Sequence, residues 1–227
     1  MTMEGSAGGD AASDANERST MSERSDTDAG RDLQLGKVAF IGDSIIQGGS
    51  WDEWLTASTV VDEGIGGATS DDVVERLPGL VEGAPDTVVL LVGTNDLAYH
   101  RTTEHIVRNI ETIVATFRRD LPDVRILVTS ILPRAREFGA QIREVNRHLW
   151  QFAPTAHAGY LDLWPVLAGE DGALLEQYSP DGLHLNEAGY GAWREALGPA
   201  LDSVLRMPPR TRPITLPYDE FARPKTA

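Results

Sequence analysis

The stretch Thr87-Val88-Val89-Leu90-Leu91-Val92 decides the fold class, and Gly93 follows it directly. Every residue of this run is apolar or β-branched, and a short run of this kind bounded by a glycine is typical of a buried β-strand. A strand that is apolar on both faces must be covered on both sides, which favours a parallel sheet between two layers of helices.

Weaker and equally strong strand patterns recur along the chain, with helical patterns between them. The strand candidates are residues 37–41, 59–61, 124–129 and 160–163. Apolar residues spaced three and four apart predict helices after residues 69, 102 and 141, and over residues 187–205 with a break near Gly198-Pro199. Alternating strands and helices favour a doubly wound α/β fold, a three-layer α/β/α sandwich around a five-stranded parallel sheet.

Both ends of the chain differ in composition from the middle. Residues 1–35 are rich in Gly, Ser, Ala, Asp and Glu and cannot bury enough apolar surface to offset their ordering entropy, so we expect a disordered acidic tail. Residues 207–227 hold too many prolines for a helix or a central strand, and we expect them to run extended or to fray. The folded domain is therefore predicted to span residues 36–206.

Charge and composition exclude several classes of partner. The 227 residues carry 20 Lys and Arg against 35 Asp and Glu, a formal net charge of −15, which repels nucleic acids and anionic membranes. No apolar run approaches the roughly 20 residues of a membrane-spanning helix, so we expect no membrane insertion. The first thirty residues lack the apolar core of a secretory signal, and a cytoplasmic location is the default expectation.

Two polar motifs follow strand candidates in the first third of the chain. The run Phe40-Ile41-Gly42-Asp43-Ser44-Ile45 places Ser44 at the carboxyl end of a strand, where its hydroxyl can face a cleft. Taken alone, such a serine is more often a turn or helix-cap residue. The glycine-rich run at residues 64–70 can bring a backbone N–H close to a ligand, but it also fits a plain loop into a capped helix.

Two further motifs lie later in the chain. Asn95 in Val92-Gly93-Thr94-Asn95-Asp96 has a side-chain amide that could donate to an oxyanion, although an Asx turn also explains it. In Ser179-Pro180-Asp181-Gly182-Leu183-His184-Leu185-Asn186, Asp181 stands three residues before His184. One short loop can therefore supply a general-base histidine and the carboxylate that orients it.

The remaining histidines lack this setting. His100, His105, His148 and His157 have no motif beside them, and we expect them in solvent. Without cysteine, a His-Glu-x-x-His sequence or a cluster of His and Asp, the chain predicts neither a disulfide nor a metal site.

In order and together, the four motifs resemble the sequence blocks of the GDSL/SGNH hydrolases. The matching positions are Gly42-Asp43-Ser44, Gly67, Gly93-Thr94-Asn95-Asp96 and Asp181-Gly182-Leu183-His184-Leu185-Asn186. The resemblance covers about residues 37–205 and is greatest to small bacterial acylhydrolases related to platelet-activating-factor acetylhydrolase and to sugar O-acetylesterases. It implies the flavodoxin-like α/β/α fold of these enzymes.

The resemblance also implies a serine esterase that needs no cofactor. Ser44 would be the nucleophile, His184 the general base and Asp181 the residue that orients it. The backbone N–H groups of Ser44 and Gly67 and the side chain of Asn95 would form the oxyanion hole. The expected substrate is a small soluble ester with a short, acetyl-type acyl chain.

Substrate contacts and the exact reaction stay open at this point. Trp51, Trp54, Arg134 and the loop over residues 134–140 are candidate walls of the pocket. Arg134 follows a strand and could contact a polar leaving group, although a surface salt bridge is as plausible. An acyltransferase using the same acyl-enzyme and a catalytically silent flavodoxin-like binding module remain as alternatives.

Overall fold

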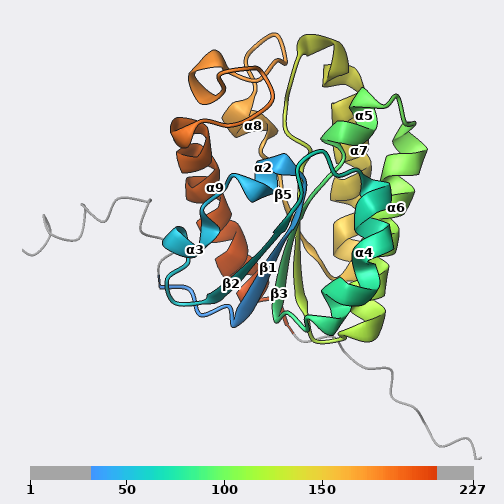
Figure 1. Ribbon diagram of the computed structural model, residues 1–227, viewed down its shortest axis with the longest axis vertical. Helices are drawn as coiled ribbons and strands as arrows, with labels where there is room; N and C mark the ends of the chain where they lie inside the picture. The colour runs from blue at the N-terminus through green and yellow to red at the C-terminus, as the bar shows by residue number, and fades with distance from the viewer. Residues whose placement is uncertain (1–31, 209–227) are drawn as a thin grey trace, which may run out of the picture.

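A computed structural model describes residues 32–208, which form a five-stranded parallel sheet flanked by helices (Figure 1). The strand order is β2-β1-β3-β4-β5, and every neighbouring pair is parallel. The strands are β1 (Lys37–Gly42), β2 (Thr59–Gly64), β3 (Thr87–Leu91), β4 (Arg125–Thr129) and β5 (Gly159–Leu161). The predicted fold class is confirmed.

Side chains of the central strands alternate between two hydrophobic cores. In β1, Ala39 and Ile41 belong to one core cluster, and Val38 and Phe40 belong to the other. The residues of β3 divide between the clusters in the same way. Since successive side chains of a strand point to opposite faces, two cores explain why these strands are apolar at every position.

Helices cover the sheet unequally. The first core lies under α4 (Ser70–Glu82), α6 (Thr103–Asp120) and α7 (Gly139–Phe152), and the second lies mainly under α9 (Glu187–Leu205), on the opposite side of the sheet (Figure 1). The shorter elements are α2 (Ser44–Gln47), α3 (Trp51–Trp54), α5 (Thr94–Ala98), η2 (Arg136–Phe138), η3 (Ala153–Ala156), α8 (Trp164–Leu167) and η4 (Glu176–Tyr178). Of these, α2 and α5 directly follow β1 and β3, so they gather at the carboxyl ends of the strands.

Local side-chain hydrogen bonds fix where the long helices begin. Thr69 and Asp72 form a capping box at the start of α4, and Asn186 accepts a hydrogen bond from the backbone N–H of Gly189 at the start of α9. These caps set the points at which two loops end: the glycine-rich loop before α4, and the loop of residues 179–186 before α9, called the Asp181 loop below.

The last helix does not break at Gly198-Pro199 as predicted. Helix α9 runs through Pro199 to Leu205. Both Pro199 and Glu195, whose carbonyl loses its helical partner to the proline, are exposed, so water can satisfy that carbonyl. Leu197 and Leu201 are fully buried on the other face, and their packing on the sheet favours a continuous helix.

The two predicted tails lie mostly outside the described residues, which exclude residues 1–31 and 209–227. Leu35, which composition assigns to the N-terminal tail, is 1% exposed and packs in the second core. Its backbone N–H donates to Ser58 Oγ, and Ser58 donates in turn to the carbonyl of Leu33. Between residues 32 and 208, no helix combines the length and apolarity that crossing a membrane requires.

Candidate active site

Ser44 is the first residue of α2, immediately after β1. Asp43 caps this short helix by accepting a hydrogen bond from the N–H of Ile45. The turn needs a glycine before it, because a Cβ at Gly42 would lie 1.9 Å from the carbonyl oxygen of Leu91. From the far side of the second core, the hydroxyl of Tyr190 donates to the carbonyl of Ile45 and holds α2 against α9.

The Ser44 side chain contacts a histidine, and that histidine contacts a carboxylate. Ser44 Oγ lies 3.0 Å from His184 Nε2, although the two residues are 140 positions apart in the sequence. His184 Nδ1 lies 2.7 Å from Asp181 Oδ2. The structure therefore brings together the three residues that the motifs predict as a group.

The loop that carries Asp181 and His184 is held mainly by its own hydrogen bonds. Asp181 Oδ1 accepts from the N–H groups of Leu183 and His184, while Gly182 adopts a φ of 74°. Ser179 Oγ accepts from the N–H of Gly182 and donates to the carbonyl of His184. The hydrogen bond from the His184 side chain, followed by the backbone N–H bonds, lowers the pKa of Asp181 well below its usual range, so this carboxyl is ionised at neutral pH.

Two possible oxyanion donors, Gly67 and Asn95, approach each other through the residue after Gly67. The amide of Asn95 donates to the carbonyl of Ala68, and this bond uses only one of its two N–H groups. Gly67 has a φ of 79°, a conformation that favours glycine. Within residues 32–208, the backbone N–H groups of Ser44 and Gly67 donate to no protein atom, so both are available to a ligand.

Buried acidic groups lie behind the exposed site. Asp43 and Asp96 are both 0% exposed. Burial raises the pKa of Asp43 to about 7, and the negative charge of Asp96 is a smaller contribution in the same direction. Oδ2 of Asp43 accepts no hydrogen bond within the described residues, so the hydrogen bond from the N–H of Ile45 to Oδ1 compensates its burial only in part.

Arg134 lies beside the oxyanion region, as its position after β4 predicts. Its guanidinium donates to the carbonyl and hydroxyl of Thr94, the residue before Asn95, and stacks 4.1 Å from the centre of the Phe138 ring. Partial burial lowers its pKa. The side chain makes these contacts in place of the surface salt bridge that the sequence leaves open.

The tryptophans predicted as pocket walls belong to the core. Trp51 is 1% exposed, stacks on Phe40 and contacts Trp193 edge to face, and its indole N–H donates to the carbonyl of Ile46. Trp54 is also buried. Trp51 therefore offers no surface to a substrate, and its prediction as a substrate contact is wrong. Its hydrogen bond to Ile46 ties α2 to the aromatic cluster of the second core.

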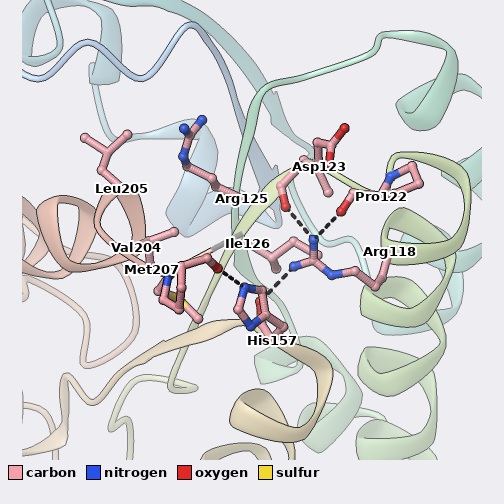
Figure 2. A pocket seen from close by; sticks show the side chains of 11 residues that line it. Arg118, Pro122, Asp123, Arg125, Ile126, His157, Val204, Leu205 and Met207 are labelled. Atoms are coloured by element: carbon pink, nitrogen blue, oxygen red, sulfur yellow. Dashed lines mark hydrogen bonds between the residues drawn. The ribbon is translucent and has the colours of Figure 1, made fainter. Parts of the chain in front are cut away.

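A cavity of about 360 Å³ lies at the opposite end of the sheet, near the amino ends of β4 and β5 (Figure 2). The guanidinium of Arg118 donates there to the carbonyls of Pro122, Val124, Ala156 and His157. Figure 2 shows this side chain pointing at the loop carbonyls. Arg118 is 8% exposed, and its guanidinium joins two loops through these hydrogen bonds. We therefore assign it a structural role.

Several residues that shape the site were not predicted as site residues. Ser70, Asp96 and Ser179 are buried polar residues, and each bonds a residue of a predicted motif or its neighbour. His105, expected in solvent, lies 3.0 Å from Asp71 and is half-buried. The positions of Ser70 and Asp96 inside two motifs were the available signal. Among residues 32–208, no group of three or more His, Asp or Glu side chains is arranged to hold a metal ion.

The fold and the site together define a class of protein. A hydroxyl at the carboxyl end of a central parallel strand, facing a histidine whose second nitrogen meets a carboxylate, has the arrangement that activates a serine as a nucleophile. By this geometry the molecule is a serine hydrolase.

Comparison with known proteins gives the family within that class. The GDSL-like Lipase/Acylhydrolase family matches residues 40–192, and the chain belongs to this family of serine ester hydrolases. It is 33% identical over 165 residues to platelet-activating factor acetylhydrolase IB subunit alpha1 of Rattus norvegicus, covering 68% of this chain and 70% of that one.

Two solved structures have the same fold. A Bacteroides fragilis protein described as an acylhydrolase superposes with a TM-score of 0.70 at 23% identity, covering 88% of this chain and 100% of that one. A Streptococcus pneumonia protein described as a platelet activating factor superposes with a TM-score of 0.66 at 28% identity, covering 84% and 97%.

Proposed function

We propose that this enzyme hydrolyses carboxylic esters with short, acetyl-type acyl chains through an acyl-enzyme on Ser44. One observation carries the proposal: Ser44 Oγ lies 3.0 Å from His184 Nε2 while Asp181 engages the other ring nitrogen. A binding module with the same sheet has no use for this alignment.

The proton relay follows from which nitrogen holds the hydrogen. Ionised Asp181 accepts a hydrogen bond from His184 Nδ1–H, which leaves Nε2 free to accept the proton of Ser44. As that proton moves, Ser44 Oγ forms a bond to the ester carbonyl carbon. The imidazolium then protonates the departing alcohol, and water repeats the sequence on the acyl-enzyme to release the acid.

The proposal assigns three hydrogen-bond donors to the tetrahedral intermediate. In this proposal its negative oxygen accepts hydrogen bonds from the backbone N–H groups of Ser44 and Gly67 and from the second amide N–H of Asn95. Within residues 32–208 neither backbone group has a protein partner, which supports these roles. Donors fixed before the reaction stabilise the charge without reorganising, which is usually the largest electrostatic contribution to such a step.

Two considerations support hydrolysis of short acyl esters. The curated relatives are named acetylhydrolases, which favours an acetyl group as the acyl part. The side chains of His184 and Asp181 are 46% and 49% exposed, so water reaches the histidine that must activate it. Open access for water favours hydrolysis over transfer to another alcohol.

Arg134 is the proposed contact for the leaving group. Its guanidinium lies next to the residue preceding Asn95 and remains partly exposed. A planar cation there would favour esters whose alcohol carries hydroxyl or carboxylate groups. Arg134→Ala should lower kcat/KM more for such esters than for apolar ones, and an unchanged ratio between the two classes would exclude the contact.

Hydrolysis of p-nitrophenyl acetate, butyrate and octanoate tests the proposed function. The wild type should prefer acetate and butyrate, and Ser44→Ala and His184→Ala should each lower kcat by about 10⁶, because members of such a group fail together. Circular dichroism checks that both variants fold. Retention of the wild-type rate by folded Ser44→Ala would show that another group is the nucleophile.

A further inference from the structure

We propose that Asp96 is a positioning residue that holds the oxyanion donors Gly67 and Asn95 at a fixed separation. The inference rests on the function proposed above. Asp96 touches no reacting atom in this account, and it acts through the glycine-rich loop and through its own neighbour in the chain.

Asp96 clamps the first residue of α4 at two points. Its Oδ2 accepts the backbone N–H of Ser70 at 2.8 Å, and its Oδ1 accepts the Ser70 hydroxyl. Both residues are 0% exposed, so no water competes for these bonds. Charge-assisted hydrogen bonds in such surroundings are about twice as strong as neutral ones, and the positive end of α4 adds to the attraction.

The clamp matters because the two glycines of the loop before it are exposed. Gly66 and Gly67 are exposed, and a side chain at Gly67 would meet no atom within 4 Å. Besides the bond from Asn95 to Ala68, the loop is fixed at its two ends. The N–H of Ile65 donates to the carbonyl of Gly42 beside the nucleophile, and Ser70 is bound by Asp96.

Asn95 and Asp96 are consecutive residues, and each forms a hydrogen bond with a different residue at the end of this loop. Asn95 donates to the carbonyl of Ala68, one residue after Gly67, while Asp96 binds Ser70. The two side chains therefore set the place of the Gly67 N–H relative to the Asn95 amide. Without the carboxylate, the bond from Asn95 to Ala68 would be the remaining polar link between α5 and the loop.

A third helix supports the clamp from behind. The amide of Asn109, on α6, donates to Ser70 Oγ at 2.9 Å and to Asp71 Oδ1 at 2.8 Å. The Ser70 hydroxyl has a single hydrogen, which it donates in its bond to Asp96. It therefore acts as the acceptor in its bond with the Asn109 amide. Three helices thus meet at a buried point directly behind the proposed oxyanion hole.

Steady-state kinetics on p-nitrophenyl acetate test the role. Asp96→Asn keeps the size of the side chain but turns one acceptor into a donor, and we expect kcat to fall about 10- to 100-fold with KM within threefold. Displacing a reacting geometry by about 1 Å costs around 10²-fold. In an Asn95→Ala background the same change should lower kcat by only about threefold, because residues that act through one another are not additive. Asp72→Asn is the matched control, since it also removes a carboxylate that binds a backbone N–H at the start of α4, and it should stay within threefold of the wild type.

The outcomes separate this proposal from the function on which it rests. Folded Asp96→Asn with the wild-type kcat, beside an inactive Ser44→Ala, would overturn the positioning role alone. Equal factors in both backgrounds, or an equal loss in Asp72→Asn, would also overturn it. If Asp96→Asn does not fold, Ser70→Ala can replace it. This variant keeps the bond from the Ser70 backbone N–H to Asp96 and removes the bond from the Ser70 hydroxyl. An unchanged kcat in Ser70→Ala would refute the proposal. An active Ser44→Ala would overturn the proposed function as well.

Discussion

The two halves of the site are built in different ways. The Asp181 loop, residues 179–186, is half-exposed, and its internal hydrogen bonds join residues no more than five positions apart. The oxyanion half, made of Gly67, Asn95 and the residues behind them, depends on bonds between residues 26 to 39 positions apart. In the proposed mechanism, the histidine that exchanges protons with water is held locally at the surface, and the proposed oxyanion donors are tied to residues in the interior.

This difference predicts how substitutions in each half should affect activity and stability. A change in an exposed side chain of the Asp181 loop should remove one chemical role and leave the rest of the molecule in place. A change behind the oxyanion half should affect stability and geometry together, because buried polar groups lose their compensation when a partner is removed.

The largest effect is expected in the locally built half. Asp181→Asn keeps the shape of the loop but leaves His184 in the wrong tautomer, and kcat should fall by about 10⁴ with little change in the free energy of unfolding. Asp171→Asn is a suitable control, because Asp171 accepts a backbone N–H from Ala173 in a similar turn without a histidine. If Asp181→Asn unfolds the protein as well, the loop is not independent in the way described.

The next effect concerns stability and belongs to the buried half. The pKa of Asp43 is about 7 in the fold against an ordinary value of 3.8, so the folded protein keeps a proton that the unfolded chain has lost between these pH values. The contribution of Asp43 to wild-type stability should therefore fall as pH rises from about 4 to 7. Asp43→Asn, which can still cap α2, should escape that loss and gain a few kcal/mol over the wild type at pH 8.

Urea unfolding of both proteins at pH 4.5 and pH 8 measures this gain. The comparison of two variants cancels the titration of all other groups. An advantage of Asp43→Asn that is the same at both pH values would contradict the raised pKa.

A smaller effect on rate is expected from one oxyanion donor. Asn95→Ala should lower kcat by about 10²–10³, the usual cost of one such donor, and leave KM nearly unchanged. The variant also loses the bond to Ala68, so thermal unfolding should show a modest loss of stability alongside the loss of rate. A reduced kcat with no change in stability would mean that Asn95 does not help to anchor the loop.

The smallest effect is expected from Ser179→Ala. This variant leaves the N–H of Gly182 and the carbonyl of His184 without their side-chain partner, but the bonds that the N–H groups of Leu183 and His184 donate to Asp181 Oδ1 remain. We expect kcat to fall less than about tenfold and stability to fall by roughly 1–3 kcal/mol. Ser203→Ala, at an exposed position of α9, is the control. A loss as large as that of Asp181→Asn would show that the loop has a single support.

The same division explains what could be predicted from the sequence. The strands and the Asp181 loop are encoded within a few residues, so apolar runs and the spacing of Asp181 and His184 were enough to find them. The convergence of Ser44 with His184 came from the family resemblance together with the rule that parallel strands end at one edge. The paired contacts of Asp96 and Ser70 join residues that sit in two different motifs, and no local pattern indicates that they meet.

Two errors have a similar origin. Trp51 follows the nucleophile closely in sequence, but residues adjacent in sequence can point into opposite surroundings, and this indole lies in the second core. Pro199 predicts a helix break from local chemistry alone, whereas burial of Leu197 and Leu201 on the other face decides the conformation. In both cases tertiary packing outweighs the local preference.

The unequal covering of the sheet also divides the intrinsic fluorescence of the protein. All five tryptophans lie in the described residues, and Trp51, Trp54 and Trp193 are buried in the second core, on the side of α9. Trp150 is 60% exposed and Trp164 is half-buried, both on the side of α7. Iodide should therefore quench the emission of the tryptophans on the side of α7 and leave that of the buried tryptophans on the side of α9 unchanged. Emission spectra can then report which side of the sheet loosens first during unfolding.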